Sequence, residues 1–253
     1  MAKIVSIINH KGGVGKTATA ANLGAALQIR EKRVLLIDMD AQSNLTDCLG
    51  VSTELDDTIY QAMRGYSPLP IVKNEDGLDI VPSCLDMSAI EMEIMQKYAR
   101  EQILHKLLRP VQKQYDYILI DCPPSLSILT INAMTASDCI IIPVEAEYLA
   151  MRGMGRLTNV IQEVKNNLNS KLRISGILIT KYDRRKNFNQ DIQEIIRDTF
   201  QGDVFTTTIR TNVAIGEATA ARHDIFHYAP KSSGAEDYAS FCDEFLKKES
   251  TFN

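Results

Sequence analysis

The stretch Ile8–Ala18, "INHKGGVGKTA", decides the fold of this chain. The usual phosphate-loop pattern, G-x-x-x-x-G-K-[ST], places its first glycine where His10 stands here. The rest of the order is intact, because an apolar run precedes the loop and a helix-like run follows Gly15-Lys16-Thr17. Glycines let backbone N–H groups turn toward phosphate oxygens, and the N-terminus of a helix adds partial positive charge. The stretch therefore predicts a phosphate-binding loop between a strand and a helix.

The residue types of this loop predict how a nucleotide would be held. The Lys16 side chain would reach the β- and γ-phosphates, and the Thr17 hydroxyl would bind Mg²⁺. The backbone amides around them would surround the remaining phosphate oxygens. The loop residues that we expect to contact nucleotide are Gly12, Gly13, Val14, Gly15, Lys16, Thr17 and Ala18.

A phosphate loop needs acidic partners at the ends of neighbouring strands. "LLIDMDAQSN" supplies Asp38 and Asp40 after one apolar run, and "YILIDCPPS" supplies Asp121 after another. An aspartate at the end of a buried strand is where a carboxylate that orders Mg²⁺ belongs. We therefore expect Thr17, Asp38 and Asp121 to form the metal site.

Short apolar runs alternate with helix-like segments along the whole chain. Several runs are apolar on successive residues, which is typical of parallel strands covered on both faces. The pattern predicts an α/β fold, a single-domain P-loop NTPase with a mostly parallel, doubly wound sheet flanked by helices. The expected strands are 3–8, 33–38, 78–82, 115–121, 138–144 and 173–180, and the expected helices are 16–30, 87–108, 126–136, 151–166, 187–200 and 234–248.

Composition limits the possible classes of protein. The chain has 253 residues, 45% hydrophobic, with a net charge of -4, which fits one globular domain spanning residues 1–253. Since the first strand-like run begins at residue 3, we expect no N-terminal DNA-reading domain. The five cysteines contain no C-x-x-C pair, which argues against a disulfide framework or a cysteine zinc site. No apolar run approaches the roughly 18 residues of a membrane span, so we expect a soluble, cytoplasmic protein.

Taken together, the motifs resemble those of the ParA/Soj family of deviant-Walker partition ATPases, within the MinD/ParA superfamily. The matching segments are "KGGVGKT", "DMDAQSN", "DCPPSLSILTINAM", "PVEAEYLAMRGM", "GILITKYDRRKN", "TTTIRTNVAIGEA" and "YAPKSSGAEDY", which span nearly the whole chain. "KGGVGKT" is specific to the wider superfamily, whereas the ensemble is specific to the partition ATPases.

The resemblance implies an ATPase that works as a dimer with ATP and Mg²⁺. Lys11 matches the extra lysine of the deviant loop, which contacts nucleotide across a nucleotide-sandwich homodimer. Asp40 matches the residue that orients or activates the attacking water, so Lys11, Lys16 and Asp40 are the expected catalytic residues. Asp38 would stand behind Mg²⁺, and Asn212 would lie near the adenine.

The resemblance also implies non-specific DNA binding by the ATP dimer and stimulation of hydrolysis by a ParB-like partner. Binding should be sensitive to salt, because neutralising phosphates releases counterions. Two departures concern this surface: "IRTNV" moves an arginine one position earlier, to Arg210 before Thr211, and Ser233 stands where a basic residue is common. The basic candidates are Arg184, Arg185, Lys186, Arg210, Arg222 and Lys231.

Alternative functions stay open at this point. A ParA-like ATPase can position another cargo, such as conjugation machinery or another protein assembly, and the altered DNA-facing residues favour this interpretation. A MinD-like membrane-surface ATPase would need a basic amphipathic C-terminal helix, but the mixed charges of "YASFCDEFLKKESTFN" favour a helix packed on the domain. An iron–sulfur ATPase would need a second cysteine near Cys122. "TKYD", Thr180–Asp183, lacks the asparagine of a guanine-reading motif, which favours ATP over GTP.

Overall fold

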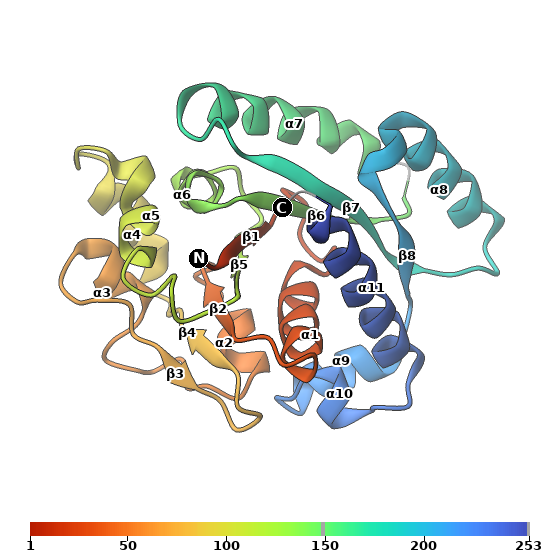
Figure 1. Ribbon diagram of the computed structural model, residues 1–253, viewed down its shortest axis with the longest axis horizontal. Coiled ribbons are helices and arrows are strands. Elements are labelled where there is room, and N and C mark those ends of the chain that lie inside the picture. Colours follow the sequence, from red (N-terminus) through yellow and green to blue (C-terminus); the bar gives the residue numbers. More distant parts are fainter. Residues whose placement is uncertain (148–149, 252–253) are drawn as a thin grey trace.

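The computed structural model describes residues 1–147 and 150–251, which form a sheet between two layers of helices (Figure 1). The sheet has eight strands in these residues, in the order β3-β4-β2-β5-β1-β6-β7-β8. Neighbouring strands run parallel except β3 and β4, which are antiparallel. The predicted mostly parallel, doubly wound sheet is confirmed.

The strands are β1 (Lys3–Ile7), β2 (Val34–Asp38), β3 (Val72–Lys73), β4 (Asp79–Val81), β5 (Tyr117–Asp121), β6 (Cys139–Glu145), β7 (Arg173–Tyr182) and β8 (Val204–Arg210). The helices are α1 (Lys16–Ile29), α2 (Asn44–Cys48), α3 (Ile59–Arg64), α4 (Met87–Ile94), α5 (Ile103–Leu108), α6 (Ile128–Ala136), α7 (Ala150–Asn167), α8 (Asn187–Phe200), α9 (Val213–Ala220), α10 (Ile225–Tyr228) and α11 (Ser233–Ser250), with short 3₁₀ turns at Arg100–Gln102 and Gln201–Asp203.

Runs of successive apolar residues become strands because both faces of the sheet are covered. All five residues of β2 are buried. Leu35 and Ile37 pack in one hydrophobic cluster with α3 to α8, whereas Val34 and Leu36 pack in the other with α1, α2 and α9 to α11. Helix α1 approaches closely, since a Cβ on Gly24 would lie 2.8 Å from Leu36 Cδ2. Strand and helix are thus in direct contact beneath the phosphate loop.

The strand order brings the predicted loop and aspartates to one edge. Strand β1 lies between β5 and β6. The chain passes from β1 to β2 on one side of β1, whereas it later passes from β5 to β6 on the other side. Such a switch point, at the carboxyl ends of the strands, is where open α/β sheets bind ligands. Asp121 at the end of β5 is in register with Ile7 of β1 and with Asp38 of β2. The loop after β1 therefore lies beside both carboxylates.

The predicted single helix over 87–108 is wrong, because the structure has two helices there. Helix α4 ends at Ile94 and α5 begins at Ile103. All five residues from 95 to 99 are exposed, and Ala99 has a left-handed φ of 51°. No buried side chain in this segment holds a continuous helix against the core, so the chain turns.

Strand β8 was not predicted, because "VFTTTIR" interrupts its apolar residues with threonines at the edge of the sheet. The C-terminal helix was predicted, and α11 buries Tyr238, Phe241 and Phe245 in the core shared with α1. Its apolar stripe is therefore packed on the domain. No helix of the described residues combines the length and the apolar character needed to cross a membrane.

Glu249 anchors the end of α11 to the sheet, and removing it should destabilise the fold. Its carboxylate is 2% exposed, contacts Arg173 and Lys3, and accepts a hydrogen bond from the Ser175 hydroxyl at 2.7 Å. Glu249→Ala removes the buried carboxylate that these groups share, so the free energy of unfolding should fall by about 3–5 kcal/mol. Urea denaturation measures this change.

Asp243→Ala is the matched control on the same helix. Asp243 pairs with Arg30 but its side chain is 68% exposed. Loss of this surface pair should cost less than about 1 kcal/mol. Equal losses for the two variants would contradict the anchoring role of Glu249.

Candidate nucleotide site

The loop between β1 and α1 has the backbone shape of a phosphate cradle. Gly13 and Gly15 have left-handed φ values of 77° and 86°, where a side chain would be strained. Gly15 begins α1 with no side-chain cap, so the first N–H groups of the helix have no side chain bound to them. The Val14 carbonyl accepts a hydrogen bond from the Thr180 hydroxyl at 2.8 Å, which braces the loop from β7. The arrangement can receive an anion at the N-terminus of α1.

Lys16 lies under the loop with its ammonium held inward. The residue is 7% exposed, and its Nζ donates to the Lys11 carbonyl at 3.2 Å. Burial lowers the pKa of Lys16, although the charge of Asp121 opposes this. A bound phosphate anion would stabilise this buried ammonium, whose partner here is a single carbonyl oxygen.

Thr17 and Asp121, two of the three predicted metal ligands, are in direct contact and are called the metal pair below. The Thr17 hydroxyl donates to Asp121 Oδ2 at 2.7 Å. Asp121 is 1% exposed, and its Oδ1 is a buried atom with no hydrogen-bond partner among the described residues. Burial, together with the nearby charge of Asp38, raises the pKa of Asp121 to about 8. A hydroxyl beside a buried carboxylate with an unused oxygen fits the hard oxygen donors that Mg²⁺ prefers.

Asp38 lies next to this pair but is already satisfied by its own chain. Its Oδ2 accepts hydrogen bonds from the Thr46 N–H at 2.9 Å and the Thr46 hydroxyl at 2.7 Å. Its Oδ1 accepts one from the Asp40 N–H at 3.0 Å. The carboxylate is fully buried, and that burial raises the pKa of Asp38 to about 6. Asp38 therefore positions Asp40 and α2, and its charge acts on the metal pair from behind.

A cleft of about 480 Å³ opens above these residues. Asp40 lines it opposite the phosphate loop, with its Oδ1 accepting a hydrogen bond from the Gln42 N–H at 3.0 Å. Apart from Lys11 and Val14, the predicted loop residues line the cleft, together with several residues that were not predicted. Its lining comprises Gly12, Gly13, Gly15, Lys16, Thr17, Ala18, Asp40, Gln42, Asn44, Asp47, Pro124, Lys181 and Thr219.

The extra lysine of the loop is held by carboxylates of its own chain. Lys11 Nζ donates to Glu147 Oε2 at 2.6 Å and to Glu145 Oε2 at 2.9 Å. The bond to Glu147 is the main reason that the pKa of Lys11 is raised. Glu145 also contacts Lys181 Nζ, at 2.6 Å. We call Lys11, Glu145, Glu147 and Lys181 the lysine–glutamate cluster.

Sequence reasoning missed Lys181 and both glutamates. Lys181 has a left-handed φ of 51° at the exposed end of β7, which turns its side chain toward the loop. The signal was present in "TKYD", which we considered only as a nucleotide-base motif. In the structure, Thr180 braces the phosphate loop and Lys181 adds a second cation beside Gly13.

His10, which replaces the first glycine of the usual pattern, packs against α7. A Cβ on Gly153 would lie 1.9 Å from His10 Cε1, so only a glycine at that point of α7 accommodates the ring. Burial lowers the pKa of His10, and the charges of Arg156 and Lys16 act in the same direction. The histidine thus occupies space beside the loop, and the glycines that cradle the anion come after it.

Asn212 is not among the residues that line the cleft. Its Oδ1 accepts a hydrogen bond from the Ala214 N–H at 2.8 Å, which caps α9, and its Nδ2 donates to the Ser233 hydroxyl at 2.7 Å. Thr219 of α9 does line the cleft. The predicted adenine contact of Asn212 stays a prediction.

The basic residues fall into two groups. Arg210 differs from expectation, because its guanidinium binds Asp237 at 2.7 Å and Glu236 at 3.1 Å, which raises its pKa. Arg185 pairs with Asp183 at 3.0 Å, and Arg222 pairs with Asp47 at 2.9 Å. The remaining candidates, Arg184, Lys186 and Lys231, are exposed and have no ion pair within the part of the chain that the structure describes.

Known proteins match the chain over nearly its whole length. A family model described as an AAA domain matches residues 2–174. The sporulation initiation inhibitor protein Soj of Bacillus subtilis is 41% identical over 248 residues, covering 96% of this chain and 98% of Soj. The chromosome partitioning protein ParA of Myxococcus xanthus is 39% identical over 251 residues, covering 98% of this chain and 89% of that protein.

Solved structures share the fold and contain nucleotides. Cobyrinic acid a,c-diamide synthase from Mycobacterium smegmatis, with bound ADP and magnesium, has a TM-score of 0.89 and 31% identity, covering 100% of this chain and 97% of its own. A plasmid partition protein from Borrelia burgdorferi bound to AMPPNP has a TM-score of 0.84 and 27% identity, covering 98% and 100%. The prediction of ATP and Mg²⁺ as cofactors agrees with these ligands.

Replacing Lys16 should remove nucleotide binding. Lys16→Ala deletes the buried ammonium, and charge-assisted hydrogen bonds contribute about 1.5–3 kcal/mol each. Two such bonds to phosphate oxygens correspond to at least roughly 100-fold in affinity. Binding of a fluorescent ADP analogue with Mg²⁺ measures the loss.

Lys165→Ala, at an exposed position on α7, is the control and should bind ADP like the parent chain. Circular dichroism checks that both variants fold. Wild-type affinity in a folded Lys16→Ala chain would contradict the role of Lys16.

Proposed function

The chain belongs to the ParA/Soj family of partition ATPases, and we propose that it is a switch that dimerises with MgATP, binds non-specific DNA and is reset by hydrolysis. The observation that carries this proposal is the position of Lys11. It lies within the phosphate loop and is bound to carboxylates that it can exchange for a phosphate. A ParB-like protein would stimulate hydrolysis.

The residues of the cleft fit MgATP. Backbone N–H groups at the start of α1 would bind phosphate oxygens, and Lys16 would move its ammonium from the Lys11 carbonyl to the β- and γ-phosphates. Thr17 and Asp121 would hold Mg²⁺, the hydroxyl directly and Asp121 through its unpartnered Oδ1 or a water ligand. The ion would neutralise the negative charge that develops on the phosphates and would compensate the buried charge of Asp121.

Dimerisation would exchange the partners of Lys11. In the monomer, the lysine–glutamate cluster holds Lys11 against Glu145 and Glu147. The Glu147 side chain is 53% exposed, so this ion pair is weak and can be replaced. A triphosphate in the facing protomer offers a stronger anion, and a second cation there stabilises charge during phosphoryl transfer. Lys181 would remain to neutralise Glu145 when Lys11 leaves.

Asp40 is the residue that we assign to the attacking water. It lines the cleft opposite the loop, and its backbone is fixed by Asp38 through the bond from the Asp40 N–H. Asp38 is fixed in turn by Thr46. A carboxylate placed in this way can orient a water for in-line attack on the γ-phosphate.

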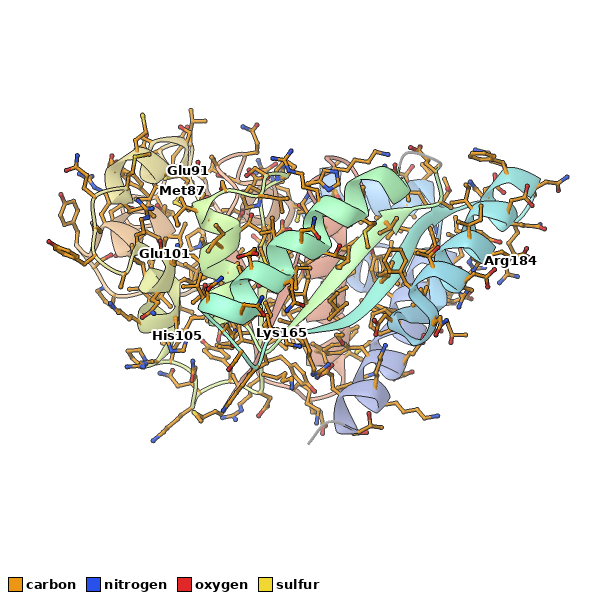
Figure 2. The ribbon with its side chains drawn as sticks, turned by 90° about the horizontal axis from the view of Figure 1, so that it is seen from above. Met87, Glu91, Glu101, His105, Lys165 and Arg184 are labelled. Atoms are coloured by element: carbon orange, nitrogen blue, oxygen red, sulfur yellow. The ribbon has the colours of Figure 1, made fainter. Side chains whose placement is uncertain are left out.

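The DNA surface would lie on the loop between β7 and α8. Arg184 and Lys186 are exposed there, on the same edge of the sheet as the phosphate loop, and Figure 2 shows Arg184 beside α8. Lys231 and, after exchange of its exposed partner Asp47, Arg222 would add to the surface. Arg210 is left out, because two carboxylates of α11 bind it.

One observation also favours a second function within the same family. With the guanidinium of Arg210 bound to Glu236 and Asp237, the unpaired basic surface is smaller than the sequence indicated. An ATPase that positions a protein assembly would need the same nucleotide switch but a different surface for its cargo. Binding to non-specific DNA distinguishes the two functions.

Asp40→Ala should block hydrolysis while leaving ATP bound. Loss of the group that orients the water should lower the rate of phosphate release by at least about 100-fold. Equilibrium binding of ATP should stay within a few-fold of the parent chain, since the loop and the metal pair are unchanged. Phosphate release and ATP affinity are measured on the same preparation, and normal turnover by the variant would remove Asp40 from its role.

DNA binding should require ATP and fall with salt. In the Asp40→Ala background, fluorescence anisotropy with a duplex of arbitrary sequence should report binding with ATP but not with ADP. Adding Arg184→Glu and Lys186→Glu should weaken this binding and reduce the salt slope by about 1 for each DNA phosphate that is no longer neutralised.

The control for this experiment is Lys165→Glu. Lys165 is exposed near the end of α7, well apart from Arg184 in Figure 2. It should leave DNA binding unchanged. Absence of binding at low salt, with ATP bound, would contradict the DNA role and favour a protein cargo.

A further inference from the structure

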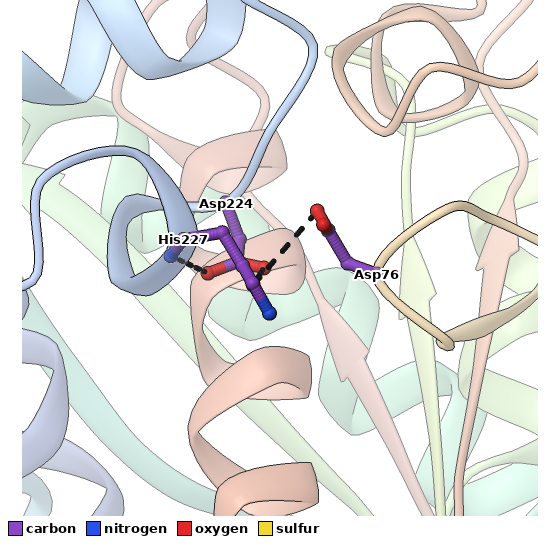
Figure 3. Close-up of side chains that lie close together, drawn as sticks. All are labelled: Asp76, Asp224 and His227. Carbon is purple, nitrogen blue, oxygen red and sulfur yellow. Dashed lines mark hydrogen bonds and ion pairs between the residues drawn. The ribbon is translucent and has the colours of Figure 1, made fainter.

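Two aspartates and two histidines converge where the β3–β4 turn meets α10, outside the phosphate loop. Asp76 lies in the turn between β3 and β4, whereas His223, Asp224 and His227 lie at the junction of α9 and α10. Figure 3 shows Asp76, Asp224 and His227 close together. His223 and Asp76 are 147 residues apart in the chain. Neither the phosphate loop nor the proposed DNA surface uses these side chains.

The distances between donor atoms suit a small cation. Oxygen and nitrogen atoms of Asp76, Asp224 and His227 all lie within 4.8 Å of one another. His227 Nδ1 is 2.6 Å from Asp224 Oδ2 and 3.8 Å from Asp76 Oδ2, and His223 Nδ1 is 3.1 Å from Asp76 Oδ2. A tetrahedral ion with bonds of about 2.0–2.1 Å separates its ligand atoms by roughly 3.4 Å. Changes of less than about 1 Å would therefore bring the two contacts of His227 and the contact of His223 with Asp76 to the spacing of a zinc site.

The charges also point to a cation at this place. Two carboxylates face each other here, and Asp224 is 1% exposed. Within residues 1–147 and 150–251, neither carboxylate has a lysine or arginine partner. Their side-chain partners are imidazoles, and Asp224 also accepts hydrogen bonds from two backbone N–H groups. Imidazoles offset these negative charges only when they are protonated, whereas a divalent ion bound between the two carboxylates would offset both whenever they are ionised.

The donor set selects the class of ion. Imidazole nitrogen combined with carboxylate oxygen suits Zn²⁺ and related transition ions better than Mg²⁺ or Ca²⁺, which prefer oxygen alone. The histidine side chains are 39% and 45% exposed, so an ion can enter and keep a water ligand. Asp224 is prearranged, because its Oδ1 accepts hydrogen bonds from the N–H groups of Phe226 and His227 at 2.8 and 3.2 Å.

We propose that Asp76, Asp224 and His227, with His223 beside Asp76, form a structural Zn²⁺ site that clamps the β3–β4 turn to the start of α10. The ion bridges segments that are distant in sequence, so binding stabilises the folded chain. His223 orients Asp76 or serves as the fourth ligand. The cysteines take no part, since all five are buried elsewhere.

Isothermal titration of Zn²⁺ into the untagged, chelator-treated full chain tests this site. Excess Mg²⁺ is present so that Asp121, beside the phosphate loop, does not bind Zn²⁺. One Zn²⁺ per chain should bind, and affinity should fall at least tenfold in His227→Asn and in Asp76→Asn. His105→Asn, which removes a histidine on α5 outside the cluster, is the matched control and should bind Zn²⁺ normally.

A second readout does not depend on binding heat. Zn²⁺ should raise the melting temperature of the parent chain and of His105→Asn, but not that of His227→Asn. His227 is half exposed, so its replacement should leave the fold intact, and circular dichroism verifies this. Absence of Zn²⁺ binding to the parent chain, or binding and stabilisation that persist in His227→Asn and Asp76→Asn, would overturn the proposal.

Discussion

Two buried carboxylates, side by side at the ends of β2 and β5, are the constraint on which this site depends. Asp38 and Asp121 are in register, and each is almost completely shielded from water. Burying like charges is costly unless hydrogen bonds or cations compensate them. The fold compensates Asp38 with the N–H groups and hydroxyl around α2. Among the described residues, one oxygen of Asp121 has no hydrogen-bond partner, and it lies beside Thr17 and Lys16. The uncompensated negative charge of Asp121 therefore lies where Mg²⁺ would bind. A triphosphate bound beside it would pair with the ammonium of Lys16.

Compensation of carboxylates by nearby cations also explains the lysine–glutamate cluster. Lys11 and Lys181 converge on Glu145, and Lys11 also reaches Glu147. The cluster holds Lys11 in one position but allows it to be released, because both glutamates are partly exposed. A phosphate oxygen carries negative charge, as their carboxylates do, and can replace them. A lysine bound in this way can change partners at little cost in desolvation. The proposed switch requires the extra lysine of the loop to have two states, of which the structure shows the one bound to Glu145 and Glu147.

Much of this arrangement could be predicted from local sequence, and the rest depends on tertiary contacts. Lys16, Thr17, Asp38 and Asp121 were predictable because the two aspartates end apolar runs, whereas Lys16 and Thr17 directly follow a glycine turn. Glu145 and Lys181 were missed, since their meeting depends on the pairing of β6 with β7. Strand β8 was not predicted because threonines interrupt its apolar residues. Residues 95–99 are exposed, and the segment that we predicted as one helix is interrupted there. The convergence of Asp76 with Asp224 and His227 joins distant segments that no local pattern connects.

Dimerisation through Lys11 is tested by the molar mass of the Asp40→Ala chain in solution, with MgATP and with MgADP, compared with the same chain carrying Lys11→Ala. Multi-angle light scattering after size-exclusion chromatography gives this mass. We expect twice the monomer mass with MgATP, the monomer mass with MgADP, and the monomer mass in both nucleotides once Lys11 is replaced. A chain that binds ATP but stays monomeric, or a dimer that persists without Lys11, would contradict the exchange of Lys11 from its own glutamates to a partner's phosphates.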